Sequence, residues 1–306
     1  MKLSMIGAGR VGSTTLFQLA LEGGIQEMAI VDIDRPRAEG EALDITHGLA
    51  QSYRSRLYSG DYDVTADSDL VVITAGIPRK PGDTRLDLLR TNVELMSGIL
   101  EQVARYSPQA MILMVSNPVD VLTYQAVRAT GFGPDRVFGL GTVLDTTRFR
   151  SLLGDRLNVS PDQVTVYMLG EHGDSMVPLL TGANIAGIPL EQFPGYSKAL
   201  LDEVIEATRF GGAEVIKRKG GTFYSVAPSI ATVIRAVRWD LKQVLPISSL
   251  LDNVLGMHDM CLSLPCVVGK GGRERVLEPP MSQGEREALQ GSWRVLREAA
   301  ESVGLK

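Results

Sequence analysis

Short apolar runs alternate with longer amphipathic segments over about the first 140 residues of the chain. Glycine, proline or polar residues bound the runs, as they bound strands, and the longer segments have the spacing of helices. Strands that alternate with helices form parallel sheets, so the pattern predicts an α/β chain with a doubly wound parallel sheet. The expected strands are Leu3–Ile6, Met28–Val31, Arg56–Tyr58, Leu70–Thr74, Met111–Ser116 and Val137–Leu140. The expected helices are Ser13–Glu22, Arg37–Ala50, Leu86–Tyr106, Val119–Ala129 and Asp145–Leu153.

The pattern changes after about residue 142. Long helices are expected at Ser197–Lys219 and Ser225–Val237, with fewer and less regular strands between and after them. A glycine-rich turn at Lys270–Gly272 joins two short strands, and Ser282 with Glu285 three residues later begins a final helix. We therefore predict two domains, one over residues 1–142 and a second, α+β domain over residues 143–306.

Composition narrows the classes of function. The chain has 31 Lys and Arg against 36 Asp and Glu, and this net charge of −5 lacks the basic character of a nucleic-acid-binding protein. Two cysteines, Cys261 and Cys266, are too few for a disulfide framework and favour a reducing compartment. No stretch approaches the roughly 20 apolar residues that span a bilayer, and the first residues do not resemble a secretion signal. We expect a cytoplasmic protein whose partner is a small molecule or a protein, with no nucleic acid and no membrane.

A glycine-rich turn lies directly between the first expected strand and the first expected helix. It reads Gly7-Ala8-Gly9-Arg10-Val11-Gly12, a G-x-G-x-x-G, and Asp32 follows Gly12 by 20 residues at the end of the next strand. Glycines let a pyrophosphate approach the backbone at a helix N-terminus, and an acid in that place accepts hydrogen bonds from an adenosine ribose. A carboxylate would repel the 2′-phosphate of NADP. The first domain is therefore predicted to be a Rossmann-type domain that binds NAD.

Further polar residues follow later strands at their carboxyl ends, where doubly wound sheets bind ligands. Thr74-Ala75-Gly76 would line the adenine and ribose side, and Asn117 would face the nicotinamide ribose or the substrate. The alternative for Asn117-Pro118 is a simple turn. We also count Asn92 and Val115 among the expected cofactor contacts.

The segment from Ile77 to Arg85 contains two prolines, one glycine and three cations. This composition is typical of a mobile lid over the edge of the sheet, and the alternative is a solvated charged loop.

The chain has only three histidines. His172 is followed directly by glycine, which suits a side chain that projects into a crowded cavity, and Asp145 could orient its imidazole and stabilise the charged form. His47 and His258 are expected to be structural. Nothing in the sequence resembles a cluster of metal ligands, so no metal is expected.

Together these residues resemble the lactate/malate dehydrogenase family, and the resemblance covers essentially the whole chain. It rests on the glycine-rich turn with Asp32, the lid segment with Arg85, and Ser-Asn-Pro at residues 116–118. It also rests on Leu-Asp-Thr-x-Arg at residues 144–148 and Gly-Glu-His-Gly-Asp at residues 170–174. Several independent motifs in the right order make it specific.

The resemblance implies an NAD-dependent 2-hydroxy acid dehydrogenase. His172 would exchange the proton of the substrate oxygen, with Asp145 holding its tautomer. Arg148 would grip the substrate carboxylate as a planar fork, and Arg85 would polarise the carbonyl as hydride leaves or joins the nicotinamide. The resemblance also implies a homotetramer or a homodimer, with interfaces built partly from the helices at 37–50 and 197–219.

The substrate depends on whether the site carries a cation for a second carboxylate. Arg79 resembles the lid arginine of malate dehydrogenases, where lactate dehydrogenases carry glutamine. Two other residues resemble those of lactate dehydrogenases and argue against a malate dehydrogenase: Asp83 and Thr222. We predict a malate dehydrogenase, with lactate as the alternative substrate and a catalytically silent NAD-binding protein as the alternative of another class.

Overall fold

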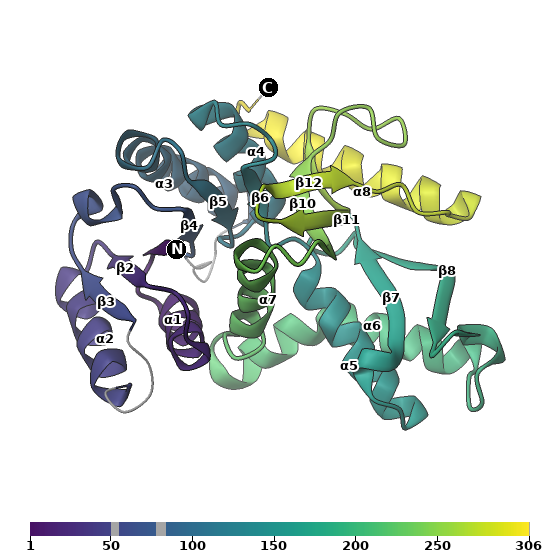
Figure 1. Cartoon of the computed structure of the whole chain (residues 1–306). Helices are drawn as coiled ribbons and strands as arrows, with labels where there is room; N and C mark the ends of the chain where they lie inside the picture. The colour runs from purple at the N-terminus through teal and green to yellow at the C-terminus, as the bar shows by residue number, and fades with distance from the viewer. Residues whose placement is uncertain (50–54, 78–83, 306) are drawn as a thin grey trace.

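A nine-stranded sheet forms the centre of the computed structural model, which describes residues 1–49, 55–77 and 84–305 (Figure 1). Its strand order is β12-β11-β10-β6-β5-β4-β1-β2-β3. Six parallel strands come from the N-terminal half: β1 (Lys2–Ile6), β2 (Glu27–Val31), β3 (Arg56–Ser59), β4 (Leu70–Ile73), β5 (Met111–Met114) and β6 (Val137–Gly139). All six predicted strands are therefore present, and the α/β fold class is confirmed.

Helices cover both faces of this sheet because the central strands are apolar on both sides. The N-terminal helices are α1 (Arg10–Glu22), α2 (Arg35–Gly48), α3 (Arg85–Tyr106) and α4 (Val119–Thr130). The first two helices share one buried cluster with α7 (Val226–Arg238), and α3 and α4 share another with α8 (Gln283–Ser302). The predicted helix at Ser282 is thus present, and its capping box with Glu285 is formed.

The strand order reverses at β1, which lies between β2 and β4. From β1 the chain continues to β2 and β3 on one side of the sheet. It then crosses back, and β4, β5 and β6 follow on the other side of β1. A crevice opens at the carboxyl ends of strands at such a reversal, and ligands bind there. The turn after β1 carries Gly7 to Gly12, so the fold places the glycine-rich turn at this crevice.

Three C-terminal strands extend the same sheet, in the region where fewer and less regular strands were expected, and the last two flank the predicted turn at Lys270–Gly272. These are β10 (Gln243–Leu250), β11 (Cys261–Gly269) and β12 (Gly272–Val276), all antiparallel. The junction is a single pair, Ser248 opposite Gly139, where a Cβ on Gly139 would come 2.4 Å from Thr123 Oγ1. Nearly all of β11 is buried, so it lacks the alternation that reveals a strand.

A smaller sheet lies beside the large one. It has the order β7-β8-β9, with β7 (Val164–Leu169), β8 (Val177–Ile185) and β9 (Ile188–Pro189). It packs with α5 (Val143–Leu157) and α6 (Lys198–Lys219) around a core that includes Phe149 and Met168. Its central strand β8 contacts α8, where the Leu180 amide donates to Glu285 at 2.6 Å, and Figure 1 shows the small sheet at the opposite end of the molecule from β3. The loop between β7 and β8 carries His172, so this sheet delivers the histidine to the carboxyl edge of the large one.

Three helix starts differ from the prediction by two residues or more, and one of them is α2, which begins at Arg35 where Arg37 was expected. The first helix begins at Arg10, three residues before the predicted Ser13, because Gly9 is its N-cap and the glycine-rich turn itself supplies the first helical turn. The helix α5 begins at Val143, two residues before the predicted Asp145. The predicted end of the second helix at Ala50 lies outside the described residues. Within the described part of the chain, no helix is long and apolar enough to cross a membrane.

Candidate active site

Two glycines of the glycine-rich turn, Gly7 and Gly12, lie where a side chain has no room. A Cβ on Gly12 would lie 2.1 Å from the carbonyl oxygen of Gly7, and a Cβ on Gly7 would lie 2.7 Å from the amide nitrogen of Ala75. Gly9 faces open space, because a Cβ there would meet nothing within 4 Å. The opening lies at the N-terminus of α1, whose first amides have no partner inside the helix and carry the positive end of its dipole. These features fit a pyrophosphate, as the sequence predicted.

Asp32 lies directly after β2 and is fixed by the main chain. One carboxylate oxygen accepts the Ala8 amide at 2.6 Å, and the other accepts the Asp34 amide at 2.9 Å. The side chain is partly exposed, so each oxygen keeps capacity for a further donor. The acid is therefore anchored beside the glycine-rich turn, where a ribose hydroxyl could reach it.

The predicted contacts after β4 and β5 lie against one another at the same crevice. The Thr74 hydroxyl donates to the Gly7 carbonyl at 3.1 Å, and the Ser116 hydroxyl donates to the Ala75 carbonyl at 2.5 Å. Gly76 is exposed beside them. The crevice is thus lined largely by main chain, which suits a flat ligand with many polar atoms.

Asn92 has a different place from the one expected of a cofactor contact. It is 2% exposed, and its amide oxygen accepts the Ile77 amide at 2.8 Å. Its amide nitrogen donates to the carbonyls of Ile77 and Asn117. The side chain therefore joins the segment after β4 to the turn after β5. Asn117 itself is exposed at that turn, and Val115 is half-buried just before it, so both stay predicted contacts.

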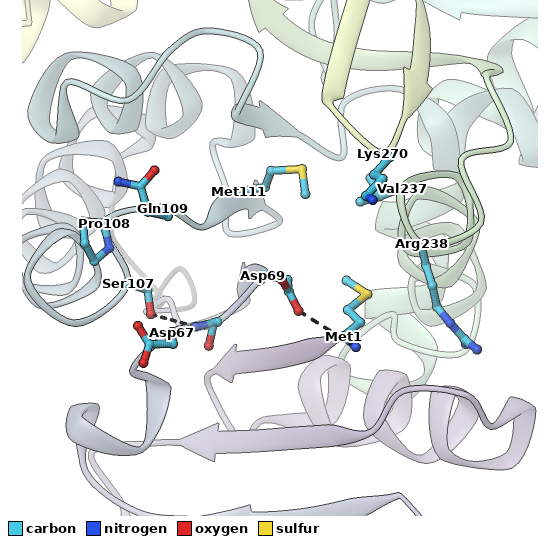
Figure 2. Close-up of a pocket in the computed structure, with 11 residues that line it drawn as sticks. Met1, Asp67, Asp69, Ser107, Pro108, Gln109, Met111, Val237, Arg238 and Lys270 are labelled. Carbon is cyan, nitrogen blue, oxygen red and sulfur yellow. Dashed lines mark hydrogen bonds and ion pairs between the residues drawn. The ribbon is translucent and has the colours of Figure 1, made fainter.

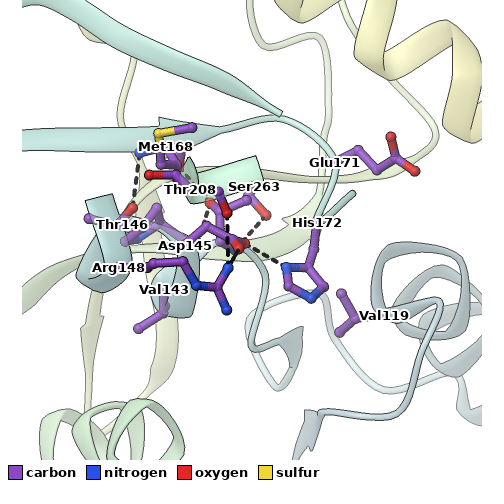
Figure 3. Close-up of polar contacts among 12 residues, drawn as sticks. Val119, Val143, Asp145, Thr146, Arg148, Met168, Glu171, His172, Thr208 and Ser263 are labelled. Carbon is purple, nitrogen blue, oxygen red and sulfur yellow. Dashed lines mark hydrogen bonds and ion pairs between the residues drawn. The ribbon is translucent and has the colours of Figure 1, made fainter. Parts of the chain in front are cut away.

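A carboxylate, an imidazole and a guanidinium meet at the other side of the crevice (Figure 3). Asp145, in the first turn of α5, is completely buried, and its Oδ2 lies 2.5 Å from His172 Nδ1. Its Oδ1 accepts Arg148 Nη1 at 3.1 Å, and the same Nη1 donates to the Thr208 carbonyl at 3.2 Å. One carboxylate thus orients both cationic side chains, which are one-quarter or less exposed. The structure brings together the three residues that the sequence singled out here.

The pair between Asp145 and His172 is strongly polarised. The negative charge of Asp145 raises the pKa of His172 from 6.5 to about 9, although burial opposes the charged imidazole. Burial would raise the pKa of Asp145, yet the charge and hydrogen bond of His172, with the charge of Arg148, lower it. The imidazole is therefore held protonated around neutral pH, with Nδ1 on Asp145 and Nε2 free to face a substrate. A proton donor with an oriented partner is the arrangement that acid–base catalysis needs.

The loop that carries His172 is fastened at its main chain from several directions. Gly170 pairs with Ser263 of β11 through two backbone hydrogen bonds. The Glu171 amide donates to the Ser292 hydroxyl of α8 at 2.8 Å, and Figure 3 shows the Glu171 side chain pointing away from His172. Gly170 has a φ of +88°, and a Cβ there would lie 2.8 Å from Ser292 Oγ. The loop is consequently rigid where the imidazole is attached.

Sequence reasoning missed one buried acid at this loop. Asp120, in the first turn of α4, accepts the His172 amide at 2.9 Å on Oδ2 and the Ser248 hydroxyl at 2.6 Å on Oδ1. It is 1% exposed. The only available signal was an acid inside the apolar run that begins α4, and an acid near a helix start has an ordinary explanation in the helix dipole.

The remaining predicted residues are placed only in part. Arg79 and Asp83 lie outside the described residues, and Arg85 is the first residue of α3, directly after that segment. Thr222 lies half-buried on the connection between α6 and α7. No group of three or more His, Cys, Asp or Glu residues in the described ranges could hold a metal ion.

A separate hollow of about 450 Å³ lies at the opposite edge of the sheet (Figure 2). Met1, Asp69 and Met111 line it, next to the amino ends of β1, β4 and β5, with Arg238 and Lys270 on the other side. The catalytic residues described above lie at the carboxyl ends of these strands. This hollow is therefore not the site that contains His172.

Comparisons with known proteins agree with this geometry. Residues 1–139 match the family model of the lactate/malate dehydrogenase NAD binding domain, and residues 142–304 match that of the alpha/beta C-terminal domain. An L-lactate dehydrogenase of Synechococcus sp. (strain JA-3-3Ab) is 40% identical over 304 residues, which cover 99% of each chain.

Two solved structures have the same fold over nearly the whole chain. The minor L-lactate dehydrogenase of Enterococcus mundtii has a TM-score of 0.96 at 32% identity, covering 100% of this chain and 99% of that one. The malate dehydrogenase of Salinibacter ruber has a TM-score of 0.93 at 35% identity, covering 99% and 97%. The N-terminal half is thus an NAD-binding domain, and NAD is the cofactor, as predicted. The chain belongs to the lactate/malate dehydrogenase family.

Proposed function

We propose that this protein is an NAD-dependent malate dehydrogenase that interconverts (S)-malate and oxaloacetate. The observation that carries the reaction class is the joint contact of Asp145 with His172 and Arg148. These groups supply a proton donor and a carboxylate-binding cation next to a crevice that fits a dinucleotide. NAD, when bound, supplies the hydride acceptor or donor at its nicotinamide ring.

His172 donates a proton to the substrate oxygen in one direction of the reaction and accepts it in the other. In the direction of keto acid reduction, the protonated imidazole donates from Nε2 to the carbonyl oxygen as charge develops there. In the direction of oxidation, the neutral imidazole accepts the hydroxyl proton at the same atom. Asp145 holds Nδ1 in both directions, so the ring keeps its orientation throughout.

Arg148 binds the carboxylate next to the reacting carbon. Among the described residues, both of its hydrogen bonds leave from Nη1. The remaining N–H groups of the guanidinium can therefore donate to the substrate carboxylate, in the parallel pair that this planar group favours. Gly211 gives this side chain its room, because a Cβ there would lie 2.7 Å from Arg148 Cδ. Arg85, at the start of α3, is proposed to polarise the substrate carbonyl.

Arg79 is the basis for choosing a dicarboxylate substrate. Oxaloacetate brings a second carboxylate that the guanidinium can pair with. Pyruvate would leave the cation without a partner in a closed site, at a cost of about 3 kcal/mol or more, equivalent to roughly a hundredfold in rate. The identity of this one side chain therefore favours malate.

Lactate is the second candidate, and two kinds of observation favour it. Asp83 would oppose a dicarboxylate in the same segment, and Thr222 is similar to the lactate type. The curated relative and one of the two solved structures compared above are named lactate dehydrogenases. These names belong to proteins that differ from this chain at more than half of their positions.

The test compares kcat/KM for oxaloacetate and pyruvate with NADH, in the native protein and in Arg79→Gln. A preference for oxaloacetate of about a hundredfold that collapses in the variant supports malate. Lys80→Gln is the matched control, since it removes a neighbouring charge of the same segment and should keep the preference. A native preference for pyruvate refutes malate and selects lactate. Tight NADH binding without turnover of either substrate would indicate a silent NAD-binding protein.

We also propose that the protein is a homotetramer or a homodimer. Large apolar side chains are exposed on the two helices predicted to form interfaces, with Leu43 on α2 and Phe210 and Ile216 on α6 each about half exposed. Large apolar residues exposed on a helix are common at surfaces that another protein covers. Light scattering tests this proposal, and a monomer at working concentration would contradict it.

A further inference from the structure

A second carboxylate lies behind the histidine, and the proton transfer described above does not use it. In the described part of the chain, Asp120 forms no hydrogen bond with the imidazole of His172. It binds the main-chain amide of His172 at 2.9 Å instead, and its other oxygen accepts the Ser248 hydroxyl at 2.6 Å. Three elements that are distant in sequence, α4, β10 and the loop after β7, therefore meet at this buried acid.

We propose that Asp120 is a positioning residue for His172, which fixes the histidine backbone and acts through space on the charge of its imidazole. The proposal rests on the proposed role of His172 as the acid and base. Asp145 would hold the ring from one side and Asp120 would hold its main chain from the other.

The fold gives this acid a fixed place. Asp120 is the second residue of α4, and the amides and positive dipole end of the first turn favour a negative charge there. Because Asp120 accepts the His172 amide, the backbone of His172 is held at a fixed distance from α4. This is the helix that begins directly after the turn that contains Asn117, the residue predicted to face the nicotinamide ribose or the substrate. Hydride and proton transfer both depend on that spacing, because a displacement of about 1 Å between reacting groups can cost about a hundredfold in rate.

Asp120 carries a negative charge at neutral pH, although it is buried. Burial raises its pKa to about 6, although the Ser248 hydroxyl, the His172 amide and the charge of His172 all favour the carboxylate. At neutral pH it is therefore ionised and contributes, after Asp145 itself, to the raised pKa of His172. Other charged or titratable groups act on this pair from three elements. They are Arg148 on α5, Glu171 on the histidine's own loop and Cys261 on β11.

A purely structural role predicts something different from this proposal. If Asp120 only filled space and satisfied two donors, asparagine would replace it without electrostatic effect, because its carbonyl oxygen still accepts the His172 amide. If Asp120 also acts by its charge, the same substitution lowers the proton affinity of the imidazole while leaving the loop in place. Asp120→Asn therefore separates the two roles.

The direct measurement is an NMR titration of the imidazole Cε1–H signals. The chain has only three histidines, and the signal of His172 is identified by its loss in His172→Asn. We expect Asp120→Asn to lower the pKa of His172 by about one unit, as removal of a nearby opposite charge does. Thr123→Val is the matched control: it removes another buried hydroxyl of α4, which donates to the Val119 carbonyl of the same helix and lies beside Gly139, and should leave the titration unchanged.

The kinetic measurement is the pH profile of kcat/KM for keto acid reduction. The alkaline decrease should begin about one pH unit lower in Asp120→Asn, which means about tenfold less activity above both pKa values and little change near pH 6. Ser248→Ala provides a second variant. It removes one donor to the carboxylate but leaves Asp120 ionised around pH 9, so the alkaline decrease should stay close to its native position.

The outcomes are distinct. An unchanged His172 titration in a folded Asp120→Asn protein overturns the proposal, and so does a shifted titration with an unmoved kinetic profile. A shifted titration in a protein that reduces no keto acid supports the contact between Asp120 and His172 and overturns the proposed dehydrogenase function instead.

Discussion

The substitution Asp145→Asn tests the central pair most directly. In the native protein the pKa of His172 is raised from 6.5 to about 9, mainly by the charge of Asp145. Each pKa unit corresponds to about 1.4 kcal/mol, so the charged imidazole is favoured by about 3 kcal/mol. Asparagine has nearly the same shape and no charge. Burial then dominates, because it disfavours the imidazolium, and the pKa of His172 should decrease to 6.5 or below.

The assay is kcat/KM for keto acid reduction, measured from about pH 5.5 to 9.5. The native protein should keep its activity up to about pH 9. In the variant the decrease should begin at least two pH units lower, and at about pH 8.5 the loss should be at least a hundredfold. Misorientation of the ring reduces the rate at all pH values, so the position of the break and not the height of the curve measures the charge. An unmoved break would refute the assignment of His172 as the proton donor.

The same pair makes a prediction about stability. A group with a raised pKa in the folded protein stabilises the fold fully below its unfolded pKa and loses that contribution as the pH rises through the folded value. For His172 this window runs from 6.5 to about 9. The difference in unfolding free energy between native protein and Asp145→Asn should therefore be about 3 kcal/mol smaller above the window than below it. Urea unfolding at a series of pH values measures it, and a constant difference would contradict the linkage.

Three further substitutions probe the rest of the site. Asp32→Ala should weaken NADH binding about tenfold and reduce discrimination against NADPH, as fluorescence titration would detect; unchanged discrimination would argue against the acid as the ribose contact. Asp120→Asn should be more stable than the native protein above pH 6 by up to about 3 kcal/mol, because burial raises the pKa of Asp120 from 3.8 to about 6; no gain between pH 5 and 8 would count against this. Gly211→Ala should raise the KM for the keto acid at least tenfold by displacing Arg148, with NADH affinity as the control that must not change.

Much of the fold followed from local pattern. The alternation of apolar runs and amphipathic segments located every strand of the parallel sheet, because five of those strands are short and buried and only β3, at the edge, is partly exposed. The attachment of β10 was not predictable, since it depends on one pair, Ser248 with Gly139, that lies more than a hundred residues apart in sequence. The start of the first helix was placed three residues late, at Ser13, because its true N-cap is Gly9 inside the glycine-rich turn.

The candidate site was also predictable only in part. Asp145 and His172 were paired from their residue types and motifs, and the structure joins them at 2.5 Å across 27 residues of sequence. Asp120 escaped notice because its burial results from Ser248 and His172, which come from other elements. An acid in the first turn of a helix has the same sequence signature whether it is solvated or buried. A hydrogen bond from a side chain to the main chain of a distant segment, such as that of Asp120 with the His172 amide, cannot be recognised from the order of residues in the sequence.

The fastening of the histidine loop has a consequence for when activity can first appear. The loop after β7 is bonded to β11 through Ser263 and to α8 through Ser292, and both follow it by about a hundred residues. A chain that emerges from the ribosome can form the dinucleotide crevice early, from its N-terminal half. The imidazole, in contrast, has no fixed place until the last helix has been made and has docked. Nucleotide binding should therefore precede catalytic competence during synthesis, and turnover would report that the whole chain has folded.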